Sequence, residues 1–122
     1  MAGAVEGTKG AWGEECAAAY LRRHGYRILA RNYSCRFGEI DLIAEKDGVL
    51  LFVEVKLRTN LQYGAPREYV TVKKQEKLRT AALLYLSGRE LDVPARFDVA
   101  EVYTDVHRSA GKTRIRYIAN AF

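Results

Sequence analysis

The sequence has few of the residues that build disulfide frameworks and histidine-based active sites. Its 122 residues include only two cysteines and two histidines. Cys16 and Cys35 have neither a partner pair nor the spacing of metal ligands, so both are expected to be reduced thiols. His24 and His107 are far apart in sequence, and no serine or cysteine is arranged with them as a nucleophile. These absences argue against a disulfide-rich secreted protein and against a covalent enzyme.

Long apolar runs are also missing. No segment approaches the ~20 apolar residues that span a bilayer, and the opening MAGAVEGTKGA lacks the basic and apolar regions of a signal peptide. We therefore expect a cytoplasmic protein without a membrane partner. Residues 1–12 are expected to form a flexible N-terminus. Residues 13–122 are expected to form one domain, because this length supports a single hydrophobic core.

Positive charge is present in excess and in clusters. The net charge is +5, and basic residues gather early, in the middle and late in the chain. Such clusters favour a polyanionic partner with a phosphate backbone. The alternative is a solvated surface that keeps the protein soluble.

The strongest local pattern is a hairpin around Asp47-Gly48, a dipeptide typical of two-residue β-turns, between two apolar segments. Counting outward from this turn pairs Asp41 with Glu54. Side chains two apart on a strand share a face, so Lys56 should lie beside both carboxylates. Because opposed like charges destabilise a sheet, we expect a cation between the two acids.

Oxygen ligands favour a hard divalent ion, so Mg²⁺ or Mn²⁺ is the predicted cofactor. The alternative is that Asp41 and Glu54 are solvated residues on an open sheet face, with Lys56 neutralising one of them. The apolar neighbours Phe52, Val53, Val55 and Leu57 favour a buried central strand, and charges in such a strand usually serve a site.

The remaining pattern predicts a helix over residues 13–24, a strand over 26–33, the hairpin, a helix from the N-cap Thr71 to about Leu86, and two strands near 95–105 and 114–122. Glu14 is an acid on the apolar stripe of the first helix, where interaction with the helix dipole is the simplest explanation. The predicted class is α/β, in the order helix, three strands, helix, two strands.

Several motifs carry a family resemblance. They are Gly13-Glu14-x-x-Ala17-x-x-Tyr20-Leu21, Gly25-Tyr26, Arg31-Asn32-Tyr33, Gly38-Glu39-Ile40-Asp41-Leu42-Ile43, Phe52-Val53-Glu54-Val55-Lys56-x-Arg58 and Arg96-Phe97-Asp98-Val99. Over residues 13–102 the chain resembles the bacterial YraN-like uncharacterised family. That family is similar to the PD-(D/E)XK nucleases, especially the Holliday junction resolvases. The resemblance implies a restriction endonuclease-like αβββαβ core, a mixed sheet flanked by helices.

The resemblance also implies roles for individual residues. It makes Asp41 and Glu54 metal ligands with the Val55 carbonyl, Lys56 the residue that orients or activates the attacking water, and Glu14 an accessory acid. Two positions depart from the pattern: Ile40 stands where proline is expected, and the residue four positions after Gln75 is Arg79 rather than the tyrosine of some nuclease branches.

The resulting hypothesis is a Mg²⁺- or Mn²⁺-dependent endonuclease acting on nucleic acid, with branched DNA as a candidate substrate and a symmetric homodimer as a candidate assembly. The alternative is a non-catalytic nucleic-acid-binding module that retains the fold. The residues expected to contact nucleic acid are Arg36, Arg58, Lys73, Lys74 and Lys77.

Overall fold

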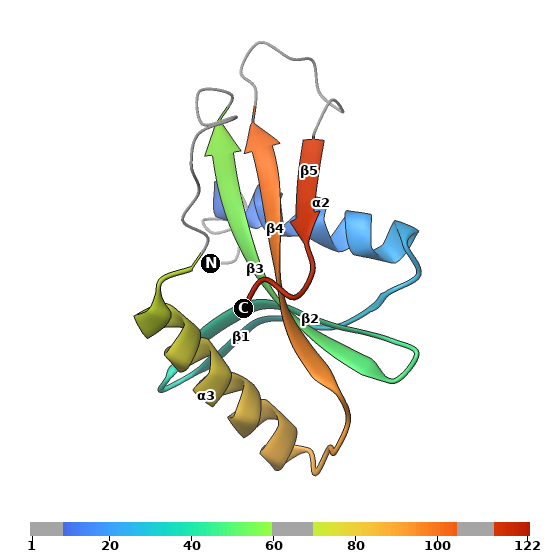
Figure 1. Cartoon of the computed structure of the whole chain (residues 1–122). Coiled ribbons are helices and arrows are strands. Elements are labelled where there is room, and N and C mark those ends of the chain that lie inside the picture. The colour runs from blue at the N-terminus through green and yellow to red at the C-terminus, as the bar shows by residue number, and fades with distance from the viewer. Residues whose placement is uncertain (1–8, 60–69, 105–113) are drawn as a thin grey trace, which may run out of the picture.

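The computed structural model describes residues 9–59, 70–104 and 114–122. The elements in this part of the chain follow the predicted order (Figure 1). They are α2 (Lys9–Arg23), β1 (Arg27–Cys35), β2 (Gly38–Lys46), β3 (Val49–Thr59), α3 (Val72–Gly88), β4 (Ala95–Thr104) and β5 (Arg114–Ile118). The α/β class is therefore confirmed.

The strands of the described residues form one five-stranded mixed sheet in the order β1-β2-β3-β4-β5. Neighbouring strands are antiparallel except β3 and β4, which run parallel. Parallel neighbours need a long crossover connection. The segment between β3 and β4 supplies it, and α3 lies within that segment.

The hairpin turn between β2 and β3 has the predicted geometry. Asp47 and Gly48 adopt positive φ values of 55° and 81°, as the two central residues of a type I′ turn do. The register runs from the pair Lys46–Val49 to the pair Leu42–Val53. The predicted register is confirmed over this ladder, and Asp41 and Glu54 are the next residues beyond its last pair.

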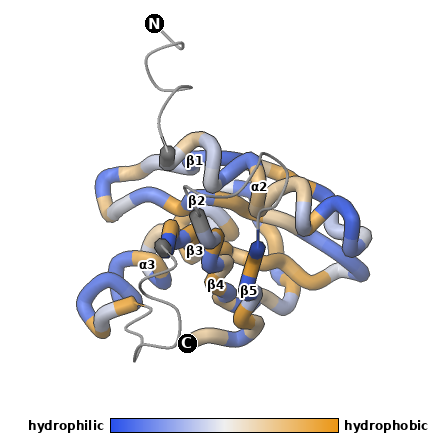
Figure 2. Tube along the Cα trace, turned by 90° about the horizontal axis from the view of Figure 1, so that it is seen from above, coloured by the Kyte–Doolittle hydropathy of each residue, from blue (hydrophilic) through white to orange (hydrophobic). Residues whose placement is uncertain are grey.

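Helices α2 and α3 cover opposite faces of the sheet (Figures 1 and 2). One face packs Ala17, Ala18 and Leu21 of α2 against alternate strand residues, including Leu51 and Val53. The other packs α3 through Leu78, Ala81, Ala82 and Tyr85 against the intervening residues, including Leu50 and Phe52. This alternation follows from the period of two along a strand. Burial on both faces makes β3 the central strand that its apolar sequence predicts.

Several boundaries differ from the sequence prediction. Helix α2 begins at Lys9 rather than residue 13, and β1 extends to Cys35 rather than residue 33. The N-cap Thr71 is confirmed, since its side chain accepts a hydrogen bond from Lys74 N. His107 and the turn expected at residues 109–111 lie outside the described residues. No helix in the described ranges has the length and apolar character to cross a membrane.

Candidate functional site

The site lies where β2 and β3 separate. Their ladder ends at Leu42–Val53, and beyond it the N–H of Val55 donates to Oδ2 of Asp41 at 2.8 Å. A side-chain carboxylate thus takes the bond that a β2 carbonyl would otherwise accept. A strand residue directs its N–H and C=O to the same edge, so the Val55 carbonyl also faces the gap between the two strands.

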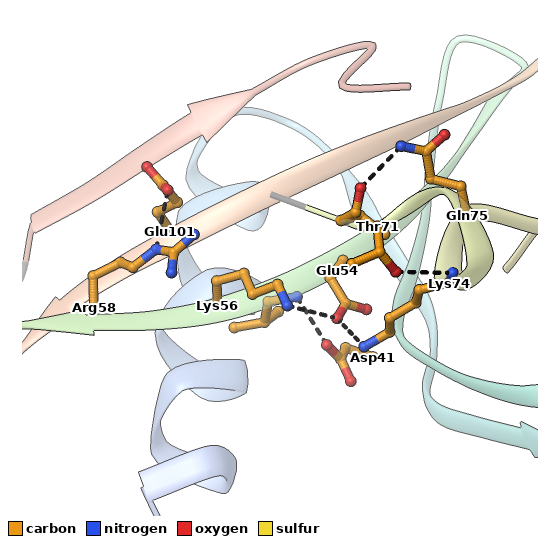
Figure 3. A network of polar contacts seen from close by, with 10 residues as sticks. Asp41, Glu54, Lys56, Arg58, Thr71, Lys74, Gln75 and Glu101 are labelled. Atoms are coloured by element: carbon orange, nitrogen blue, oxygen red, sulfur yellow. Dashed lines mark hydrogen bonds and ion pairs between the residues drawn. The ribbon is translucent and has the colours of Figure 1, made fainter. Parts of the chain in front are cut away.

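Glu54 is a nearly buried carboxylate at this gap, with 6% of its side chain exposed. Its Oε2 contacts two ammonium groups, Nζ of Lys74 at 2.5 Å and Nζ of Lys56 at 3.7 Å. Figure 3 shows Asp41 and Glu54 side by side, with Lys74 reaching between them from α3. The predicted convergence of Asp41, Glu54 and Lys56 on one side of the sheet is confirmed as geometry.

The electrostatics of Asp41 reflect this crowding. Burial, and after it the neighbouring Glu54 carboxylate, are the main causes that raise the pKa of Asp41 from its ordinary value of 3.8 to about 7. The Val55 N–H lowers the pKa, the Glu14 carboxylate raises it, and the Lys74 charge lowers it. The raised pKa means that Asp41 holds its proton to a higher pH than an exposed aspartate does.

Glu14 reaches this neighbourhood from the opposite face of the sheet. Helix α2 approaches β3 closely at Gly13, where a Cβ atom would lie 2.8 Å from Cδ2 of Leu57. The close approach brings the next residue, Glu14, near the strand gap, and Nδ2 of Asn32 donates to its Oε1 at 3.1 Å. Glu14 is thus held by a strand residue and acts on Asp41 through its charge.

A pocket of about 340 Å³ lies beside the carboxylates. It is lined by Gly38, Glu39, Thr71, Lys73, Lys74, Lys77 and Leu78. Lys73 and Lys77 are exposed side chains of this lining, so both are accessible to the nucleic acid that they are expected to contact. Lys74 also lines the pocket, and its Nζ donates a hydrogen bond to Glu54, so this residue links the pocket to the carboxylates.

The two arginines of the predicted nucleic-acid surface lie elsewhere. Nε of Arg58 pairs with Oε2 of the fully buried Glu101 at 3.2 Å, and only 17% of the Arg58 side chain is exposed. Arg36 lies at the turn between β1 and β2, with its guanidinium 5.0 Å from the ring centre of Phe37. The structure therefore gives Arg58 a packing role on the sheet, while Arg36 stays at the surface.

The donor set can be tested against a divalent ion. In the described ranges no group of three or more histidine, cysteine or acidic side chains is placed to hold a metal. Asp41, Glu54 and the Val55 carbonyl instead offer an incomplete set of oxygen donors. Mg²⁺ commonly uses one or two carboxylates and completes its shell with water and substrate phosphate, so the residues fit an ion of this kind.

Sequence reasoning missed the contact between Lys74 and Glu54. The signal for it was the spacing of Lys74, Leu78, Ala81 and Tyr85, which follows one face of a helix. Leu78, Ala81 and Tyr85 are buried against the sheet, so the residue one turn earlier also faces it. Gln75 is held by the start of the helix, because its Nε2 donates to the Val70 carbonyl at 3.0 Å.

Comparison with known proteins gives one family. Residues 13–102 match the model of the uncharacterised protein family UPF0102. The chain belongs to this family. It is the YraN-like family that the sequence motifs indicate.

Relatives in UPF0102 match along almost the whole chain. A UPF0102 protein of Symbiobacterium thermophilum, STH1475, is 52% identical over 90% of this chain and 92% of its own length. One from Syntrophomonas wolfei is 46% identical over 93% of this chain and 96% of its own. One from Nitrosomonas europaea, NE0719, is 40% identical over 95% and 94%. These names give a family and no activity.

Proposed function

We propose that the protein is a metal-dependent nuclease that hydrolyses phosphodiester bonds in nucleic acid. The observation that carries the proposal is the convergence of Asp41, Glu54 and Lys56 where β2 and β3 separate, beside a lysine-lined pocket. The helix, three strands, helix and strand around a mixed sheet support a restriction endonuclease-like core of the PD-(D/E)XK type.

Each residue has a role that its position supports. Asp41, Glu54 and the Val55 carbonyl would hold Mg²⁺ or Mn²⁺, and Glu14 would add negative charge from α2. A bound ion of this type lowers the pKa of a water molecule and polarises a phosphate oxygen. Lys56, with 28% of its side chain exposed, is close enough to orient the attacking water and to stabilise charge that develops on the phosphate.

The substrate contacts would come from the pocket. Lys73 and Lys77 are exposed cations on its rim, suited to successive phosphates of one strand. Branched DNA is the first substrate to test, because the family resemblance is to junction resolvases. A symmetric dimer would suit two cuts on such a two-fold substrate, and sedimentation of the protein with and without a four-way junction measures it.

A non-catalytic nucleic-acid-binding module is the second candidate. The observation that favours it is the pair of lysines already placed on Glu54, which neutralises the carboxylate without a metal. A binding module would keep the basic pocket and have no requirement for a divalent ion. A nuclease would need the ion for cleavage.

Cleavage of a labelled panel separates the two candidates. Branched, duplex, flap and single-stranded DNA and RNA are incubated with wild type, Glu54→Gln and the control Glu45→Gln, in Mg²⁺, Mn²⁺ or EDTA. Glu45 lies on β2 away from the site and pairs with Arg27. We expect metal-dependent cleavage by wild type and Glu45→Gln and none by Glu54→Gln. Equal binding without cleavage of any substrate would favour the binding module.

A further inference from the structure

Lys74 holds the position that a cation at Glu54 would take. Its Nζ lies 2.5 Å from Oε2 of Glu54, and it also feels the charges of Asp41 and Glu39. Burial lowers the pKa of Lys74, but the hydrogen bond to Glu54 and these charges outweigh it, so the pKa lies above the ordinary lysine value. The ammonium is therefore a tethered counter-ion for the acidic pair.

The Lys74 ammonium can leave Glu54 when another cation binds there. Its side chain is 46% exposed, whereas that of Glu54 is 6% exposed. The carboxylate is thus fixed within the sheet, while the ammonium sits on a flexible four-carbon stem at the start of α3. An ion that binds Oε2 of Glu54 must displace or share this position, so metal binding competes with the ion pair.

The displaced ammonium has a second place to bind. Lys74 lines the pocket next to Lys73, Lys77 and the helix N-cap Thr71. A phosphate in this pocket would attract Lys74 away from Glu54 and leave the carboxylate open to a divalent ion. The same residue then links two ligands of opposite charge.

We infer that Lys74 is an exchangeable counter-ion that makes divalent metal and polyanion bind cooperatively. Binding of either ligand requires the Lys74–Glu54 ion pair to break, so the ligand that binds first makes binding of the second more favourable. Phosphate attracts the ammonium away from Glu54, and a metal ion on Glu54 frees the ammonium to bind phosphate. Such coupling is reciprocal by thermodynamic necessity. The inference rests on the proposed nuclease site and adds to it an order of assembly in which bare metal binding is weak and substrate strengthens it.

The test uses Lys74→Met, with Lys74→Gln as a second variant without the cation and Lys74→Arg as the conservative variant. Mn²⁺ alone is titrated into each full-length protein at about pH 8.5, where Asp41 is ionised. We expect Lys74→Met and Lys74→Gln to bind Mn²⁺ about fivefold more tightly than wild type, since a partly exposed ion pair contributes up to about that factor. Lys74→Arg should stay close to wild type.

Coupling is measured with a labelled DNA four-way junction in EDTA and in Ca²⁺, by fluorescence anisotropy. Wild type should bind the junction several-fold more tightly in Ca²⁺, and Lys74→Met should lose most of that gain. The control is Lys73→Met, because Lys73 lines the same pocket whereas Lys74 is the residue of the pocket that pairs with Glu54. Lys73→Met should weaken junction binding by the same factor in both conditions and keep the gain.

Either of two results would overturn this inference without affecting the proposed function. In the first, Lys74→Met and Lys74→Gln bind Mn²⁺ no more tightly than wild type does. In the second, Lys74→Met keeps the full increase in junction affinity that Ca²⁺ gives the wild type. In both cases the metal site itself stands, provided Glu54→Gln loses Mn²⁺ binding. If wild type and every variant bind no Mn²⁺, the inference and the proposed function fail together.

Discussion

The substitution Asp41→Asn should stabilise the metal-free protein while it removes a proposed metal ligand. Asparagine has the shape of aspartate and keeps an oxygen that can accept the Val55 N–H. It removes the negative charge that burial and the Glu54 carboxylate make costly. A residue placed for fold stability alone would respond in the opposite direction.

The magnitude follows from the pKa. The pKa of Asp41 is about 7 in the folded protein and near 3.8 when unfolded, so the folded state binds the proton more tightly. Stability is therefore lost as pH rises from about 4 through 7. Since one pKa unit corresponds to about 1.4 kcal/mol, ionised Asp41 costs the folded state up to about 4 kcal/mol above pH 7. At pH 5 the cost falls to about 2 kcal/mol.

Urea unfolding in EDTA between about pH 5 and pH 8.5 measures this difference. Asp41→Asn should be more stable than wild type at every pH in the range, with a gain that grows toward pH 8.5. The matched control is Asp47→Asn, at an exposed turn position with positive φ that asparagine accepts equally well. An Asp41→Asn protein that is no more stable than wild type at pH 8.5 would refute the reasoning from carboxylate crowding.

Two further predictions concern the basic residues. Replacing Lys73 and Lys77 with alanine should weaken nucleic-acid binding and reduce the slope of log K against log salt by about 2, because each duplex phosphate contact contributes about 0.9; an unchanged slope would place the binding face elsewhere. Arg58→Met should lower the free energy of unfolding by about 3 kcal/mol, because it leaves Glu101 as a buried charge without its guanidinium. The double variant with Glu101→Gln should recover part of that loss in the same urea assay, and a loss confined to DNA affinity would contradict this packing role.

The part of the site that depends on local sequence could be predicted. Asp47-Gly48 fixes a two-residue turn, and the turn fixes the register that brings Asp41 beside Glu54. The end of the ladder could not be predicted, because it depends on the Asp41 carboxylate taking the Val55 N–H. The alternation of apolar and polar residues along a strand does not indicate that a side-chain carboxylate will replace a backbone carbonyl as the acceptor.

The contacts between distant segments were beyond local reasoning. Lys74 was expected only to contact nucleic acid, yet the packing of α3 against the sheet also brings its ammonium group to Glu54. Arg58 was assigned to nucleic acid, and its pairing with Glu101 depends on the parallel contact of β3 with β4. A crossover connection sets the contact between β3 and β4, and the sequence of neither strand determines the register of this pair.

The most direct test of the nuclease account is single-turnover cleavage by Lys56→Ala, measured beside its binding of Mn²⁺ and of the same DNA. Lys56 lies 3.7 Å from Glu54 and is partly exposed, so its loss should leave the fold and both binding reactions nearly intact. If Lys56 stabilises the transition state, cleavage of the DNA in Mg²⁺ should fall by about 10²-fold or more. Cleavage by Lys56→Ala at the wild-type rate would contradict the account.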